Sequence, residues 1–191
     1  MTLPKSLKVL AAGATIAALS TNAAFAAMAS LPPCKTGGGP VSIVIETDTA
    51  SGWTVNGVPA IAVSNVAWAN AGSAKWIGLS GAQPGTLTYV VRFSAPMLHG
   101  PMKVTARWAT DNCGTSLRAG TGTPVPTGPC YSAGSPNGRD FMYFNHSTTA
   151  SFSPADNNDP NPSITFVTAN QPGSPAGMAG TFVVTAECRC P

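Results

Sequence analysis

The chain has 191 residues, of which 43% are hydrophobic and only 9% are charged, and it contains 20 Gly and 18 Pro. Soluble domains average roughly 25% charged residues, so this composition excludes coiled coils and long helical bundles, which need regularly spaced Glu, Lys and Arg. Plentiful apolar residues and a formal net charge of only +3 also argue against a disordered chain. The composition is typical of one secreted, β-rich domain.

Residues 1–27 have the pattern of a secretory signal peptide. Lys5 and Lys8 precede an apolar run over residues 9–19, and the small-x-small sequence Ala24-Phe25-Ala26 follows. The run is shorter than the ~18–20 residues needed to span a bilayer. We therefore expect a mature protein without a membrane span, secreted to the cell surface or the extracellular space.

Residues 28–40 contain two prolines in succession and a Gly-Gly-Gly-Pro sequence, so we expect a flexible N-terminal segment there, followed by one domain over residues 41–191. Within that domain, β-branched or alternating runs recur between clusters of Gly, Pro, Asn and Asp, at residues 41–48, 86–93, 103–109, 163–168 and 181–186. No helical-period segment lies between these runs, which disfavours a parallel α/β sheet. The pattern predicts an all-β antiparallel sandwich or barrel.

The charged residues indicate no nucleic-acid partner. Without Lys5 and Lys8, eight basic residues remain against seven acidic ones, and the basic residues are scattered along the chain. Binding to phosphates requires clustered Lys and Arg.

All five cysteines follow the signal peptide: Cys34, Cys113, Cys130, Cys188 and Cys190. In an oxidising compartment disulfides are the expected state. We expect Cys113 to pair with Cys130 around a Gly/Pro-rich loop, and Cys34 to pair with Cys188 or Cys190, leaving the other as a free or intermolecular thiol. A metal or redox role for Cys188-Arg189-Cys190 is an alternative, although no further ligands occur at metal-site spacing.

The four tryptophans are Trp53, Trp68, Trp76 and Trp108, and they lie in or beside the strand-like runs. Core packing is the expected role for most of them, and an exposed sugar-binding surface is the alternative. Tyr131 and Tyr143 lie near loops rich in Gly, Pro and Asn. We expect these two tyrosines to face solvent.

Several motifs occur in a fixed order: Trp53-Thr-Val-Asn-Gly57, Ala74-Lys-Trp-Ile77, Pro84-Gly-Thr-Leu-Thr-Tyr-Val-Val-Arg-Phe93 and Val104-Thr-Ala-Arg-Trp-Ala-Thr-Asp-Asn-Cys-Gly-Thr115. This order resembles a family of galactose-binding-type jelly-roll domains found among exosortase-sorted (PEP-CTERM) bacterial surface proteins. There a W-I segment precedes a G-T-Y-T-Y-x-x-x-F strand, and a strand ending W-x-x-D-N follows. The resemblance implies a jelly-roll β-sandwich. The chain departs from the family at Ser116–Gly120, where a Leu-Asn-Gly turn is usual, and it shows no sorting tail.

No catalytic motif accompanies the two histidines, His99 and His146, and the pair Glu46 and Asp48 fits a solvated strand face better than an acid/base pair. We therefore expect no enzyme activity and no cofactor. A structural calcium ion has two candidate loops, Asp156-Asn157-Asn158-Asp159 and Asp111-Asn112, but neither fits a complete calcium-binding loop.

Two functions remain open. The first is a carbohydrate-binding module that binds an extracellular glycan at one end of the sandwich, with Tyr131, Tyr143, Asp111 and Asn112 as the candidate ligand-binding residues. The second is a structural subunit of an extracellular assembly, in which like subunits associate by strand exchange or an intermolecular disulfide.

Overall fold

A computed structural model describes residues 28–35, 37–81, 83–95, 99–111, 113–127, 144–173 and 175–188. Its strands are β1 (Val41–Glu46), β2 (Thr54–Val55), β3 (Val58–Pro59), β4 (Ile61–Ala62), β5 (Ile77–Gly78), β6 (Gly85–Arg92), β7 (His99–Asp111), β8 (Cys113–Ala119), β9 (Val125–Pro126), β10 (His146–Ser151), β11 (Ser163–Asn170) and β12 (Gly177–Cys188). One 3-10 helix, η2 (Pro154–Asn158), lies between β10 and β11. The signal peptide expected over residues 1–27 lies outside the described residues.

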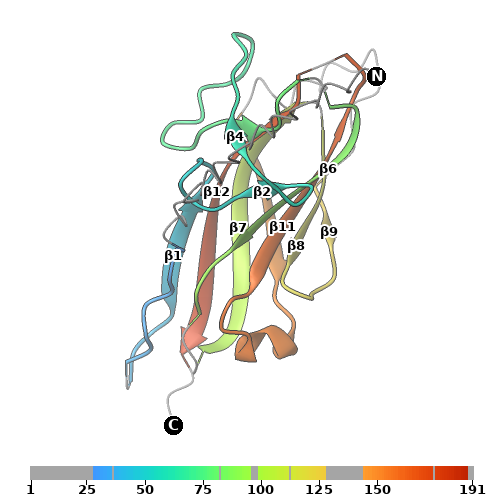
Figure 1. Cartoon of the computed structure of the whole chain (residues 1–191). Coiled ribbons are helices and arrows are strands. Elements are labelled where there is room, and N and C mark those ends of the chain that lie inside the picture. The colour runs from blue at the N-terminus through green and yellow to red at the C-terminus, as the bar shows by residue number, and fades with distance from the viewer. Residues whose placement is uncertain are drawn as a thin grey trace, which may run out of the picture.

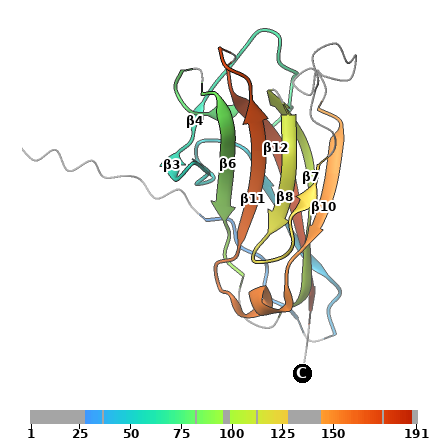
Figure 2. The same ribbon diagram turned by 90° about the vertical axis from the view of Figure 1, so that its right-hand side faces the viewer.

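The strands form two antiparallel sheets that pack as two layers (Figures 1 and 2). The first sheet has the order β10-β7-β12, and on the far side of β12 lie both β1 and the short β5-β4 pair. The second sheet has the order β3-β2-β6-β11-β8-β9. The all-β antiparallel sandwich predicted from the sequence is confirmed.

The strand order is that of a jelly roll. When the short inserted pairs β2-β3 and β4-β5 are set aside, eight strands remain, and the first sheet joins the first, eighth, third and sixth of them as β1-β12-β7-β10. The second sheet joins the second, seventh, fourth and fifth as β6-β11-β8-β9. The first and last strands of the roll are therefore neighbours in one sheet.

Alternation along the strands produces the core. In β7, the side chains of Met102, Val104, Ala106 and Trp108 are buried, whereas Lys103 and Arg107 between them are exposed. Because successive side chains of a strand point to opposite faces, the first set faces the second sheet. Trp108 packs there on Phe166, with ring centroids 5.2 Å apart.

The start of the segment before β1 packs on the sandwich, and the flexibility expected over residues 28–40 stays a prediction. Leu31 is 1% exposed and belongs to the core. Backbone hydrogen bonds join Leu31 N to Ser94 O and Ser94 N to Ala29 O. A single apolar side chain with two backbone bonds is enough to fix the start of this segment against the sheet.

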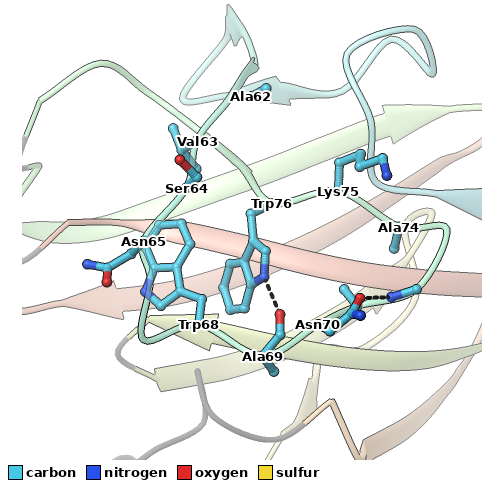
Figure 3. A pocket seen from close by; sticks show the side chains of 12 residues that line it. Ala62, Val63, Ser64, Asn65, Trp68, Ala69, Asn70, Ala74, Lys75 and Trp76 are labelled. Atoms are coloured by element: carbon cyan, nitrogen blue, oxygen red, sulfur yellow. Dashed lines mark hydrogen bonds between the residues drawn. The ribbon is translucent and has the colours of Figure 1, made fainter.

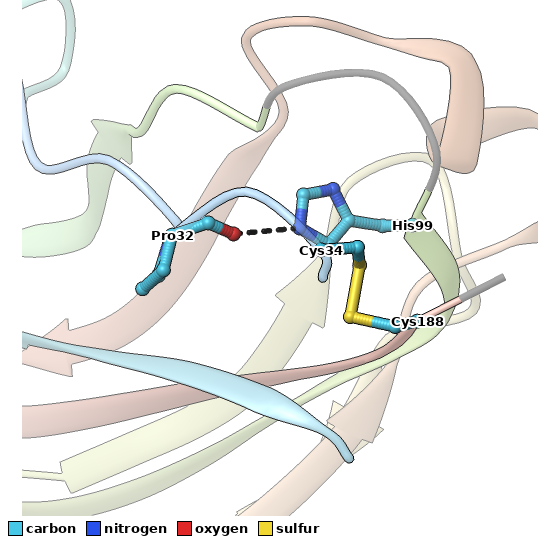
Figure 4. The surroundings of a disulfide bond; sticks show 4 residues. All are labelled: Pro32, Cys34, His99 and Cys188. Carbon is cyan, nitrogen blue, oxygen red and sulfur yellow. Dashed lines mark hydrogen bonds between the residues drawn. A yellow bond between two sulfur atoms is a disulfide. The ribbon is translucent and has the colours of Figure 1, made fainter. Parts of the chain in front are cut away.

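A disulfide fixes the other end of the same segment. Cys34 is bonded to Cys188 at the end of β12, with the two Cα atoms 5.4 Å apart (Figure 4). The side chain of His99, beside this bond, has its Nε2 atom 3.2 Å from Pro32 O. The expected pairing of Cys34 with one of the C-terminal cysteines is thus confirmed, with Cys188 as the partner. Cys113 is also disulfide-bonded, whereas Cys130 and Cys190 lie outside the described residues.

Just after β10, the buried carboxylate of Asp156 organises a corner. It accepts hydrogen bonds of 2.8–3.1 Å from the backbone N–H and hydroxyl of both Thr121 and Ser153. Gly120, at φ +52°, lies so close to this carboxylate that an added Cβ would be 2.3 Å from its carbon. Only glycine fits both the backbone angle and the space there.

Candidate functional site

A 14-residue connection, residues 63–76, leads from β4 to β5 and covers the outer face of the first sheet near its upper end in Figure 1. The sheet surface beneath it is flat because the residues there are small: Gly177 and Ala179 on β12, and Ala109 on β7, are all buried. Ala71 and Ala74 of the connection pack with Ala179 in a small apolar cluster, to which Trp76 and Phe144 add partly buried rings. The outer face is thus closed by the connection over this region.

Trp68 and Trp76 of this connection stack on each other. Their ring centroids are 4.5 Å apart and their planes are inclined by 29°. The indole N–H of Trp76 donates to Ala69 O at 2.9 Å, within the same connection (Figure 3). Both side chains are half-buried, so part of each ring remains open to solvent.

Gly177 supports the tryptophan pair from below. A Cβ atom at this position would lie 2.8 Å from Trp68 Cη2 and 3.2 Å from Trp76 Cε3. The 2.8 Å contact is closer than real Cβ atoms approach their neighbours, so one of the rings would have to move. A glycine on β12 is therefore required for the two rings to rest against the sheet.

Asp111 fixes the orientation of Trp68. Its carboxylate Oδ2 accepts the indole N–H of Trp68 at 2.8 Å, and the residue is only 4% exposed. Hydrogen bonds to an ionised acceptor are about twice as strong as neutral ones. Asp111 therefore orients Trp68, and the ligand contact expected of Asp111 from the sequence stays a prediction.

The connection is tied to the body of the sandwich at Thr47, just after β1. The backbone N–H of Lys75 donates to Thr47 O at 2.6 Å, and the Thr47 hydroxyl donates to Lys75 O at 2.7 Å. The same hydroxyl accepts the N–H of Gly180 at 2.9 Å. Thr47 is fully buried, so these bonds hold the last turn of the connection on β12.

Two asparagine turns shape the rest of the connection. Asn65 Oδ1 accepts the N–H of Ala67, and Asn70 Oδ1 accepts the N–H of Gly72, both at 3.0 Å. These are local turns in which the side chain replaces a backbone acceptor. In each turn the hydrogen bond uses the side-chain oxygen of the asparagine and not its NH₂ group.

The stacked rings and these polar groups border a hollow of about 350 Å³. Figure 3 shows Trp68 and Trp76 at its centre, with Asn65 on one side and Asn70 and Lys75 on the other. Among the described residues that line it, Lys75 alone is charged. Aromatic walls with a few polar groups are typical of small-molecule sites, and here the walls are rigid because Asp111, Ala69 and Gly177 fix both indoles.

The remaining predicted ligand-binding residues, Tyr131, Tyr143 and Asn112, lie outside the described residues. The expectation that most tryptophans belong to the core is met by Trp53 and Trp108, which are 2% and 1% exposed, but not by Trp68 and Trp76. The sequence carries one signal for this difference. Residues 63–76 lack strand alternation and are rich in Ala, Asn, Ser and Gly, which marks a surface connection.

The possible calcium loop at residues 156–159 is occupied by protein donors. The oxygens of Asp156 accept bonds from Thr121 and Ser153, and Asp159 Oδ1 accepts the N–H of Asn161 at 2.8 Å. Burial alone would raise the pKa of Asp156, but the hydrogen bonds from Thr121 and Ser153 outweigh it and lower the pKa below its ordinary value. Among the described residues, no cluster of three metal-ligating side chains occurs.

His99 and His146 serve packing in the sandwich. His99 is 4% exposed beside the disulfide, and His146 stacks on Trp108 with centroids 4.4 Å apart. In the described part of the chain, no helix is long and apolar enough to cross a membrane.

No family model matches the chain, and no match was found among curated proteins.

Proposed function

We propose that this protein is a secreted, non-catalytic β-sandwich that binds extracellular carbohydrate, and that Trp68 and Trp76 are the side chains that contact the sugar. The observation that carries the proposal is the half-exposed indole pair at the hollow between β4 and β5. The proposed function agrees with the resemblance to galactose-binding-type jelly rolls, but places the site on a different set of residues.

Aromatic rings suit sugars because a pyranose presents C–H groups on its faces and hydroxyls around its rim. The C–H groups pack on an indole, and the hydroxyls bind polar groups at the edge of the ring. The hollow offers both kinds of contact, since the indoles of Trp68 and Trp76 lie beside the amides of Asn65 and Asn70. Rigid walls reduce the ordering cost of binding.

An exclusively structural role explains the pair less well. Covering Ala179 requires apolar surface, which Ala71 and Ala74 already supply. Large rings that remain half-exposed lose part of the hydrophobic gain that burial would give. A buried carboxylate that orients Trp68 carries a desolvation cost, which is offset when the fixed orientation of the indole serves binding.

A glycan array followed by calorimetric titration with the selected glycan tests this function. We expect saturable binding that Trp68→Ala and Trp76→Ala each weaken at least tenfold, which corresponds to about 1.4 kcal/mol. Trp53→Phe is the matched control, because Trp53 is buried between the sheets, and it should bind normally. Far-UV spectra and melting temperatures show whether each variant is folded. No binding on an array that includes bacterial and plant polysaccharides would contradict the proposal.

A second candidate function, association of like subunits, is favoured by the exposed edge of β1. Thr47 N donates to Gly180 O, so in the antiparallel pairing every second residue of β1, counted back from Thr47, directs its backbone groups to β12. The N–H and C=O groups of the residues between, including Ser42 and Val44, point away from β12. No other described strand pairs with β1. Val44 is 57% exposed, and β1 has no Lys, Pro or bulge of the kind that protects an edge strand.

Sedimentation velocity distinguishes this second function. Concentration-dependent dimers or polymers that Val44→Lys abolishes, in non-reducing buffer, would support assembly through β1. A monomer at all concentrations would exclude it and leave carbohydrate binding as the remaining candidate.

A further inference from the structure

A second hollow adjoins the first and shares a wall with it. Its volume is about 380 Å³, and Val63, Ser64 and Trp68 line both hollows. The remainder of the second hollow comes from segments far along the chain, including Leu79 after β5 and Pro175 before β12. The two hollows are therefore neighbours that share three lining residues, one of which is Trp68.

Trp68 is held in place more firmly than a loop side chain usually is. Its indole stacks on Trp76, its N–H is bonded to Asp111, and its ring rests above Gly177. Rotation of this side chain into either hollow would break the bond to Asp111 and leave a buried carboxylate without that donor. The wall between the two hollows is thus a fixed feature of the fold.

The two hollows have similar volumes but different chemistry. Lys75, Asn65 and Asn70 line the first, whereas among the described residues that line the second none is ionisable and the polar side chains are Ser64 and Ser80. Two adjacent hollows of similar volume that share Trp68 suit two linked sugar units of one chain better than one isolated sugar. A single sugar would use one hollow and leave the other empty.

We propose that the two hollows are consecutive subsites for neighbouring units of one polysaccharide chain, with the unit at Trp76 and Lys75 in the first and the next unit at Leu79 and Pro175 in the second. This inference rests on the proposed carbohydrate-binding function. It specifies the ligand as a chain of at least two sugar units and not a single terminal sugar. Because both units are joined, the second binds without a second loss of translational freedom.

Calorimetry with a monosaccharide, disaccharide and tetrasaccharide cut from the glycan selected on the array tests the proposal. We expect the disaccharide to bind at least tenfold more tightly than the monosaccharide. A bulky substitution in the second hollow, Ser80→Trp, should remove this advantage and leave monosaccharide binding unchanged. Ser147→Trp, at an exposed serine on β10, is the control and should keep the advantage.

The outcomes separate the two proposals. If the monosaccharide binds as tightly as the longer chains, or if Ser80→Trp keeps the advantage, the paired subsites are wrong while the sugar site at Trp76 stands. If no glycan binds to the native protein, the proposed function fails, and the subsites fail with it.

Discussion

Removal of the Cys34–Cys188 disulfide is expected to destabilise the protein more than any single surface change. The bond joins residues separated by 154 positions, so it closes nearly the whole domain into one loop. On the chain-entropy model, a loop of this length restricts the unfolded chain by about 5 kcal/mol at 25 °C. This value is an upper limit, because Cys113 is also cross-linked and already restricts part of the loop.

The variant to test is the double replacement Cys34→Ala/Cys188→Ala, which leaves no new thiol. For a domain of this size, 1 kcal/mol corresponds to about 2–4 °C in Tm, so a loss of about 5 kcal/mol lowers Tm by roughly 10–20 °C. Urea denaturation at several temperatures gives the free energy of unfolding directly. The single variant Leu31→Ala is the companion measurement, with an expected loss of about 2–3 kcal/mol from a fully buried leucine.

Comparison of these variants separates the two roles of the N-terminal segment. If the double cysteine variant unfolds at the same urea concentration as the native protein, the bond does not restrict the unfolded chain in the way argued here. If Leu31→Ala leaves the free energy of unfolding unchanged, the packing of residues 28–35 on the core does not contribute to stability.

Three further predictions follow from the same structure. Asp156→Asn should lower the free energy of unfolding by about 2–4 kcal/mol at neutral pH. Because the pKa of Asp156 is lowered in the folded protein, its stabilising contribution is present above the pKa of the unfolded chain and is lost as pH falls through the pKa of the folded protein. The free energies of unfolding of the two proteins should therefore converge in acid, and a constant difference down to pH 2 would contradict this. Gly177→Ala should cost about 1–3 kcal/mol and shift tryptophan emission, whereas Gly39→Ala, with open space around it, should do neither in the same measurements. Calcium or EDTA should leave Tm unchanged by calorimetry, since Asp156 already accepts protein donors; a calcium-dependent rise would refute that reading.

The sequence was sufficient to predict the fold class, because strand alternation is a local property. Residues 103–109 alternate between apolar and polar side chains, and they lie within β7. The pairing of Cys34 with the C-terminal end was also predictable, since the first and last strands of a jelly roll are neighbours.

The candidate site was not predictable in this way, because long-range contacts create it. Trp68 and Trp76 acquire their arrangement from Gly177 and Asp111, which belong to other strands. Nothing in the local sequence distinguishes these tryptophans from buried ones except the lack of alternation around them. The N-terminal segment shows the same limit, since its prolines and glycines suggest mobility while Leu31 is in the core.

The most direct test of the central claim is an NMR titration that follows the indole N–H signals of the four tryptophans as the selected oligosaccharide is added. We predict that the signals of Trp68 and Trp76 shift and saturate together, while those of Trp53 and Trp108, buried between the sheets, stay in place. Saturable shifts confined to Trp53 or Trp108, or no shift in any of the four at saturating ligand, would contradict the assignment of sugar binding to this site.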